Sequence, residues 1–331
     1  MTSGCFRSSS PRSTTSPRRL WLAFGCVFLI LVMPLKARSV TNASYAVTVP
    51  NTTQWNMTSP GGEDYQVMVY APDQPPPPGG FPVIYMLDGN ATFPMAVESM
   101  RVQQASAHGS LSAAIIVGIG YPGDEPFNMV RRAHDYTPMP REGARHAMTE
   151  EGQEVSYGGA EALYRFIQQQ VKPAIEKRFR INPGRQALFG HSYGALFALT
   201  TLFRHPDAFN IYIAASPSLW WGEGMMKTLE KEFDPTAITL DRPVRVLITV
   251  GEYEQALSPA EKKSDDASET AARRREHQMI NNAQDLARRL KMLDSQRLDA
   301  SVIVFPQEYH RSVLPVALNR AMRFILSPDT P

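Results

Sequence analysis

The sequence predicts an α/β fold with a mainly parallel central sheet and helices on both of its faces. Short segments that are apolar throughout, which is typical of strands buried on both sides, recur along the chain. Segments with helical spacing of apolar residues separate them, and this alternation is the order that produces a parallel sheet. A strand, a glycine-flanked turn and a helix also follow one another directly within residues 186–199. With 331 residues, 43% of them hydrophobic, the chain can bury one large core, and we find neither an internal repeat nor a second domain boundary.

The first 43 residues predict an export signal. A start rich in Ser and Arg precedes the apolar run of residues 20–35, and candidate cleavage sites follow Ser39 and Ala43. The alternative is an uncleaved anchor helix in the inner membrane, although the apolar run is short for a full span. We therefore expect a periplasmic or secreted protein in which residues 44–331 form a single domain.

Charge and cysteine usage narrow the function classes. Six of the 34 Lys and Arg residues precede the first acidic residue, so the chain after residue 43 carries 28 basic against 32 acidic side chains. A nucleic-acid partner is therefore not expected. The two cysteines, Cys5 and Cys26, both lie in the leader, which leaves the domain no disulfide and no thiol nucleophile. The sequence has no metal-spaced cluster of His, Asp or Glu and no glycine-rich phosphate loop, so we expect no metal or other cofactor.

The domain is predicted to open with a pair of edge strands. Residues 44–49 and 65–70 alternate apolar and polar side chains, and the stretch 51–63 between them is rich in turn formers. Residues 82–87 are apolar throughout and predict a buried parallel strand. In enzymes of this architecture the turn after such a strand donates a backbone amide to an oxyanion, and Asn90 is our candidate for that donor. The alternative is a glycine turn that only ends the strand.

The middle of the chain is harder to interpret. Residues 131–138 have too little periodicity for a helix and are expected in a loop near the carboxyl edge of the sheet. Arg132 and Tyr136 in this loop either bind an anionic, aromatic substrate or form surface ion pairs. Residues 161–178 have the spacing of a helix, which Pro173 should kink or divide.

The stretch around Ser192 predicts a catalytic serine. Gly190-His191-Ser192-Tyr193-Gly194 stands between a short apolar strand and a helix that begins at once, as in a nucleophile elbow. The sharp reversal strains the serine backbone, and the glycines let strand and helix approach closely. The hydroxyl is then held at the carboxyl edge of the sheet, and the Tyr193 amide lies at the helix start, where an oxyanion can be received. The alternative is a plain tight turn.

The C-terminal part continues the alternation of strands and helices. Residues 258–277 are highly charged and predict a solvated insertion. Further strands are predicted at residues 113–118, 210–215, 244–250 and 301–305, and further helices at residues 286–293 and 313–325.

A serine hydroxyl becomes a good nucleophile when a histidine removes its proton, so the base must be found among seven histidines. His310 lies in the loop after the last predicted strand, where the base is expected; the alternative is an exposed loop histidine. The others lie before the nucleophile, beside it, at the end of the following helix or in the charged insertion, and they are His108, His134, His146, His191, His205 and His277.

The acid partner of the base is expected just past the strand that ends at Val250. Its carboxylate would hold the imidazole tautomer and stabilise the imidazolium. Glu252 and Glu254 both qualify by position. We prefer Glu254, which stands three residues beyond the strand-end glycine.

Seven ordered motifs resemble the putative-esterase family of α/β hydrolases, over about residues 45–326. Within that family the sequence is most similar to the periplasmic esterases that open the trilactone ring of enterobactin-type catecholate siderophores. The resemblance implies an α/β-hydrolase fold and hydrolysis of ester bonds in a large, iron-chelating substrate that Arg132, Tyr136 and Trp220 contact. The motifs are residues 85–90, 117–122, Arg132 with 135–138, 190–194, 216–221, 251–254 and 310–315.

The sequence departs from the family pattern at two positions. The family often has Gly where this chain has Ala195, and a small residue where Arg311 follows the base. Some siderophore esterases of this kind are described as working with a Ser–His pair whose acid is displaced, which puts Glu254 in more doubt than the other two residues. Other functions stay open: an esterase of the same family for polysaccharide acyl groups or small thioesters, an acyltransferase, or a non-catalytic siderophore-binding protein.

Overall fold

The computed structural model describes residues 44, 46–105, 111–140, 146–148, 152–294 and 296–327. The chain divides into two compact units, Met1–Val47 and Thr48–Pro331, and every element described below belongs to the second. The predicted leader, residues 1–43, lies outside the described residues. Within the described ranges, no helix has both the length and the apolar character needed to span a bilayer.

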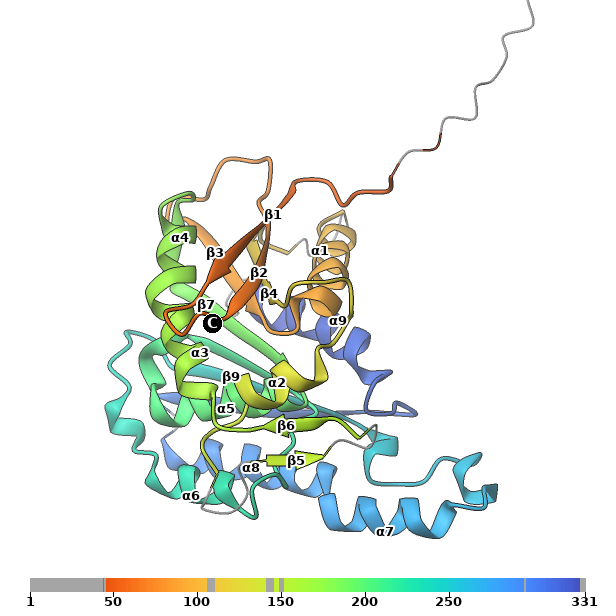
Figure 1. Ribbon diagram of the computed structural model, residues 1–331. Coiled ribbons are helices and arrows are strands. Elements are labelled where there is room, and N and C mark those ends of the chain that lie inside the picture. Colours follow the sequence, from red (N-terminus) through yellow and green to blue (C-terminus); the bar gives the residue numbers. More distant parts are fainter. Residues whose placement is uncertain are drawn as a thin grey trace, which may run out of the picture. The chain divides into compact units, whose positions relative to one another are not determined.

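A central sheet organises the unit Thr48–Pro331 (Figure 1). From β4 to the far edge at β10 all neighbouring strands are parallel, whereas β1 and β2 join antiparallel, so the prediction of a mainly parallel sheet is confirmed. Within the described residues the sheet has eight strands, in the order β1 (Thr52–Thr58), β2 (Asp64–Tyr70), β4 (Ile115–Gly120), β3 (Phe81–Met86), β7 (Ile181–His191), β8 (Ile211–Ala215), β9 (Val244–Gly251) and β10 (Leu298–Phe305).

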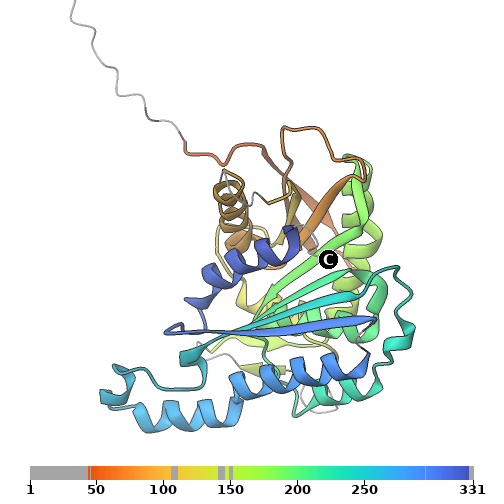
Figure 2. The ribbon, with the colours of Figure 1, turned by 180° about the vertical axis from the view of Figure 1, so that it is seen from behind.

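Helices cover both faces of this sheet, each burying an apolar stripe against it. Helices α1 (Gly89–Gln104) and α9 (Val313–Leu326) pack together on one face, and they are the brown and dark-blue helices of Figure 2. The elements on the other face are α3 (Ala160–Phe166) with its continuation α4 (Lys172–Glu176), α5 (Tyr193–Arg204), α6 (Met225–Glu232) and α8 (Met279–Leu293). The predicted helices on both faces are thereby confirmed.

The first predicted strand is wrong. Residues 46–49 have no regular secondary structure, and the edge strand is instead β1, which lies inside the stretch predicted to be turns. The strand was missed because its residues are mostly Thr, Asn and Gln, and its pairing with β2 comes from the reversal closed by hydrogen bonds between Ser59 and Glu63. Only Trp55 and Met57 pack against the core, as befits a half-exposed edge.

Helix α2 and the hairpin of two short strands differ from the sequence-based expectation, whereas the interruption near Pro173 was expected. Residues predicted as an irregular loop contain helix α2 (Met129–Asp135), which the Asn128 side chain caps by accepting a hydrogen bond from the Arg131 amide at 3.0 Å. The long helix predicted around Pro173 does change there: a π-helical turn, Ile167–Val171, separates α3 from α4. A two-stranded hairpin of β5 (His146–Met148) and β6 (Glu154–Ser156) was not anticipated.

The charged segment 258–277 was predicted to be a solvated insertion, and most of its residues are exposed or half-buried. It contains helix α7 (Ala267–His277), which has one buried residue, Thr270, and lies at the periphery of the unit (Figure 1). Within the segment Arg274 pairs with Glu261, and the same guanidinium donates to the Ala256 carbonyl at 2.6 Å, which ties the segment to the residues before it.

Candidate active site

The nucleophile elbow forms where β7 ends at His191 and α5 begins at Tyr193. Ser192 between them has φ 59° and ψ −116°, a conformation that side chains rarely adopt. Its amide donates to the Ala215 carbonyl at 2.9 Å, which anchors the turn to the neighbouring strand. A Cβ atom on Gly190 would lie 2.0 Å from the Gly194 carbonyl oxygen, so this position requires glycine. The elbow therefore holds the Ser192 hydroxyl at the carboxyl edge of the sheet.

His310 bridges Ser192 and Glu254. The Ser192 hydroxyl lies 3.0 Å from His310 Nε2, and His310 Nδ1 lies 2.6 Å from Glu254 Oε2. With the proton on Nδ1, the imidazole donates to the carboxylate and leaves Nε2 free to accept from the serine. The serine, the acid and the histidine follow β7, β9 and β10, so three loops at one edge of the sheet bring together residues that are far apart in the sequence.

Glu254 is held rigidly for this contact. The side chain is 1% exposed, and its second oxygen accepts hydrogen bonds from the Ser216 hydroxyl at 2.6 Å and the Gly251 amide at 2.7 Å. Glu252, the other acidic candidate, accepts from the Gln307 amide at 2.8 Å instead. Glu254 is thus the carboxylate that reaches the imidazole, whereas Glu252 ties down the loop that carries it.

His191 holds the backbone of His310 in place. Its imidazole is buried, and its Nε2 donates to the backbone carbonyl of His310 at 2.7 Å, since a carbonyl only accepts. Burial lowers the pKa of His191 well below its usual value, and the charges of His310 and Arg132 act in the same direction. A neutral imidazole with its proton on Nε2 therefore fixes the backbone at the base.

The two amides predicted to receive an oxyanion both lie in the first turn of a helix, where backbone N–H groups lack an intrahelical acceptor. Tyr193 is the first residue of α5, and Asn90 is the second residue of α1. The Asn90 side chain accepts from the Tyr121 amide at 2.9 Å and donates to the Tyr121 and Gly123 carbonyls, so it fixes the neighbouring loop. Asp88, at φ 51°, makes the sharp turn that starts α1.

Arg132 was expected either to bind an anionic substrate or to form a surface ion pair; in the structure its ion pair is buried. It is 5% exposed, and its Nε and Nη2 atoms each lie 3.0 Å from an oxygen of Asp88. Nη2 also donates to the His191 carbonyl at 3.2 Å. This pairing with Asp88 overcomes the opposing effect of burial and raises the pKa of Arg132. Arg132 borders the pocket at Ser192, but its charge is already neutralised by a carboxylate.

Tyr136 and Trp220, the other expected substrate contacts, have contrasting environments. Tyr136 is 1% exposed and its hydroxyl accepts from the Asp88 amide at 2.9 Å, so it lies inside the core and does not line the pocket at Ser192. Trp220 is 36% exposed and stacks on His277, with ring centroids 4.0 Å apart. His277 ends α7, so the insertion reaches the loop that follows β8, which the sequence did not indicate.

Ser192 and His310 open into a cavity of about 110 Å³. Its other lining residues are Phe127, Met129, Arg132, His191 and Arg311. Phe127 and Met129 were not predicted as site residues, because no local pattern shows that the start of α2 and the residue just before its capping residue lie beside His310. Ser218 was also missed; its hydroxyl lies 3.4 Å from that of Ser192.

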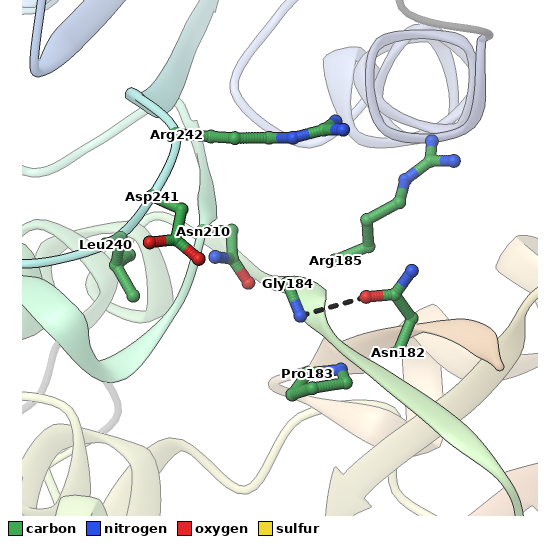
Figure 3. A pocket seen from close by; sticks show the side chains of 8 residues that line it. All are labelled: Asn182, Pro183, Gly184, Arg185, Asn210, Leu240, Asp241 and Arg242. Carbon is green, nitrogen blue, oxygen red and sulfur yellow. Dashed lines mark hydrogen bonds between the residues drawn. The ribbon is translucent and has the colours of Figure 1, made fainter. Parts of the chain in front are cut away.

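A larger cavity, of about 520 Å³, lies at the amino ends of β7, β8 and β9, the edge of the sheet opposite to Ser192 (Figure 3). Two arginines, Arg185 and Arg242, border it together with Asp241. Arg185 donates to the Ile325 carbonyl at 3.0 Å and so fastens the end of α9. Because this cavity is remote from the elbow, we regard it as separate from the candidate active site.

A parallel α/β sheet with a nucleophile elbow and a Ser–His–Glu arrangement at its carboxyl edge defines the class of serine hydrolases with the α/β-hydrolase architecture. Sequence comparison gives the same class: residues 58–288 match the family described as "Putative esterase". The chain belongs to this esterase family, and it is a hydrolase.

Similar proteins share most of the chain's length. Ferri-bacillibactin esterase BesA from Bacillus subtilis is 37% identical over 89% of this chain and 96% of its own length. Siderophore triacetylfusarinine C esterase from Aspergillus fumigatus is 34% identical over 83% and 93%, respectively. Among solved structures, the BES protein from Bacillus cereus superimposes with a TM-score of 0.72 at 33% identity and covers 87% of this chain and 99% of its own. Siderophore hydrolase EstB from Aspergillus nidulans, with the same two coverages, gives a TM-score of 0.74 at 29% identity.

Proposed function

We propose that this protein is a serine esterase that hydrolyses the ester bonds of a siderophore, a lactone of the catecholate class such as ferric enterobactin, and thereby releases iron. The single observation that carries the proposal is the position of His310 between the Ser192 hydroxyl and the Glu254 carboxylate. Among the similar proteins named above are a ferri-bacillibactin esterase, a siderophore esterase and a siderophore hydrolase, which supports a siderophore as the substrate.

The proposed mechanism is acyl transfer in two steps. His310 takes the Ser192 proton as the hydroxyl attacks the ester carbonyl, and Glu254 stabilises the imidazolium that forms. The imidazolium then gives this proton to the departing alkoxide, so the ring opens and an acyl-enzyme remains. Water, deprotonated by His310, attacks the acyl-enzyme, and Ser192 recovers its proton as the acid leaves.

The oxyanion of each tetrahedral intermediate is received by the amides of Tyr193 and Asn90 in this proposal. Both lie at helix starts, where the positive end of the helix dipole favours a developing negative charge. Loss of one such donor raises the barrier by about 3 kcal/mol. Arg132 keeps the two amides in register, since its guanidinium joins Asp88, at the start of α1, to the carbonyl of His191 in the elbow.

Replacing the nucleophile tests the mechanism. Ser192→Ala is expected to lower kcat for a simple aryl ester by about 10⁴-fold or more, because the acyl-enzyme can no longer form. Ser218→Ala is the matched control, since it removes a hydroxyl 3.4 Å away that has no role in the proposed mechanism. Circular dichroism checks that both variants are folded. Comparable turnover in Ser192→Ala and wild type would refute the mechanism.

The same serine separates an enzyme from a binding protein. A fluorophosphonate probe is expected to label the wild-type chain at Ser192, because the probe reacts with a serine that a base has activated. A non-catalytic siderophore binder would not react. Assays with enterobactin-type lactones, with and without iron, then separate siderophore hydrolysis from the cleavage of other esters.

For location, we propose that residues 1–43 direct the chain out of the cytoplasm, to the periplasm or the medium. The support is the charged start, apolar run and small residues of the leader. N-terminal sequencing of protein recovered from the periplasm or the medium is expected to begin near residue 40 or residue 44. A full-length chain confined to the cytoplasm would contradict the proposal.

A further inference from the structure

Two arginines border the pocket at Ser192, and their electrostatic states differ. Arg132 is buried and forms a two-pronged ion pair with Asp88, so its charge is largely cancelled inside the protein. Arg311 is exposed, and among the described residues it has no ion-pair partner. The positive charge that this pocket presents to a ligand is therefore mainly that of Arg311.

The position of Arg311 is fixed by its neighbours in the chain. It directly follows His310, and its carbonyl accepts a hydrogen bond from the Leu314 amide at 3.2 Å, in the turn that leads into α9. The guanidinium carbon lies 5.7 Å from the centroid of the Phe127 ring, within the range of a cation–π contact. The Arg311 side chain therefore borders the pocket and lies against the Phe127 ring, which forms part of the pocket wall.

The pocket wall has a defined chemical character. Phe127 and Met129 supply apolar surface, and the Arg311 guanidinium supplies several N–H donors in a plane, which suits a carboxylate or paired phenolate oxygens. A neutral ester would gain only the apolar contacts. An ester that carries an anionic group a few atoms from the scissile carbonyl would gain both.

We propose that Arg311 is a specificity-determining residue that selects esters with an anionic substituent close to the scissile bond, such as a catecholate or its negatively charged ferric complex. This inference rests on the proposed function and assigns to that site the charge of its preferred substrate. Arg132, which also borders the pocket, is a positioning residue, because its charge is paired with Asp88 inside the protein.

Two ester substrates test the inference. They share a 4-nitrophenol leaving group and have acyl chains of similar length, one ending in a carboxylate (the hemisuccinate) and one in a methyl group (the pentanoate). Arg311→Gln is expected to lower the ratio of kcat/KM for the anionic ester to that for the neutral ester by about tenfold, mainly through KM, and Arg311→Lys to retain most of it. The wild-type ratio should fall with added salt more than the Arg311→Gln ratio.

Arg320→Gln is the matched control. It removes the same charge from an exposed arginine on the following helix α9, away from the pocket lining. The ratio is expected to stay within twofold of the wild-type value in this variant. The inference is overturned if Arg311→Gln leaves the ratio within twofold of wild type, or if Arg320→Gln lowers it as much.

Iron-free and ferric enterobactin form a second pair of substrates, which separates the two sources of negative charge. A larger effect of Arg311→Gln on the ferric complex identifies the complex as the recognised anion, and a larger effect on the free ligand identifies the catecholate. The proposed function and this inference can be refuted independently of each other. Cleavage of the simple esters without cleavage of any siderophore would contradict the substrate class and leave the charge test intact.

Discussion

At the scale of single residues, the buried imidazole of His191 stays neutral in the folded protein and donates to the His310 carbonyl. Its folded-state pKa lies well below the 6.5 of a free histidine because burial and nearby positive charges disfavour protonation. Below about pH 6.5 the unfolded chain binds a proton that the folded chain does not, so this residue's contribution to stability is present above that pH and is lost as the pH falls through the folded pKa.

The predicted consequence is a pH-dependent difference between wild type and His191→Gln, a variant that keeps a donor and cannot be protonated. Between pH 7 and pH 5 the free energy of unfolding should fall more steeply in wild type, by up to about 1.4 kcal/mol per pH unit. Urea unfolding at several pH values measures this slope. Equal slopes in the two proteins would show that His191 does not titrate on unfolding.

The acid of the triad is tested by a pair of isosteric changes. Glu254→Gln removes the charge that stabilises the imidazolium and is expected to lower kcat by about 100-fold or more. Glu252→Gln, two residues away, affects only the hydrogen bond to the Gln307 amide, and its kcat should fall by less than tenfold. Aryl-ester hydrolysis at pH 7 measures both. Similar rates for the two variants would indicate a Ser–His pair that works without an acid.

At the scale of elements, the Asp88–Arg132 pair joins three segments: the turn between β3 and α1, helix α2, and the elbow carbonyl of His191. Arg132→Met would leave the Asp88 carboxylate buried without a partner. We expect a loss of about 3–5 kcal/mol in the free energy of unfolding. The double change Asp88→Asn with Arg132→Met should recover part of this loss, because no unpaired charge remains. The denaturant midpoints of wild type, Arg132→Met, Asp88→Asn and the double variant form the cycle, and additive losses would show that the pair is not coupled.

Elements were predictable from the sequence where one local pattern decides them. The uniformly apolar runs became β3, β4 and β8, since a strand buried on both faces needs apolar side chains throughout. Strand β1 and helix α2 were missed because a polar edge strand and a seven-residue helix depend on their tertiary partners. Chain order pointed to Ser192 and His310, which lie 3.0 Å apart, but it left Glu252 and Glu254 open; only Glu254 contacts the imidazole in the structure.

The surroundings of those three residues could not be predicted in the same way. The sequence does not show that Arg132 pairs with the distant Asp88. It also does not show that His277, in a segment predicted to be solvated, stacks on Trp220. Both contacts join segments that are well separated in the sequence. Local patterns carry no information on such pairings.

At the scale of the whole molecule, the candidate site lies at the carboxyl edge of the sheet. The charged segment 258–277 reaches the same edge where His277 stacks on Trp220, in the loop after β8. The parallel strands β7, β8, β9 and β10 all end there, and the loops after β7, β9 and β10 carry the proposed nucleophile, acid and base. This concentration follows from strand direction, because parallel strands place all their carboxyl ends on one side. The opposite edge holds the cavity at Arg185 and Arg242.

The order of the three groups along the chain also has a temporal consequence. The hydroxyl at position 192 is synthesised well before the imidazole at position 310, whose loop follows β10, the strand that pairs with β9 at the edge of the sheet. A growing chain that has not reached residue 310 lacks the proposed proton acceptor. In this proposal hydrolysis therefore requires the last strand of the sheet as well as the elbow.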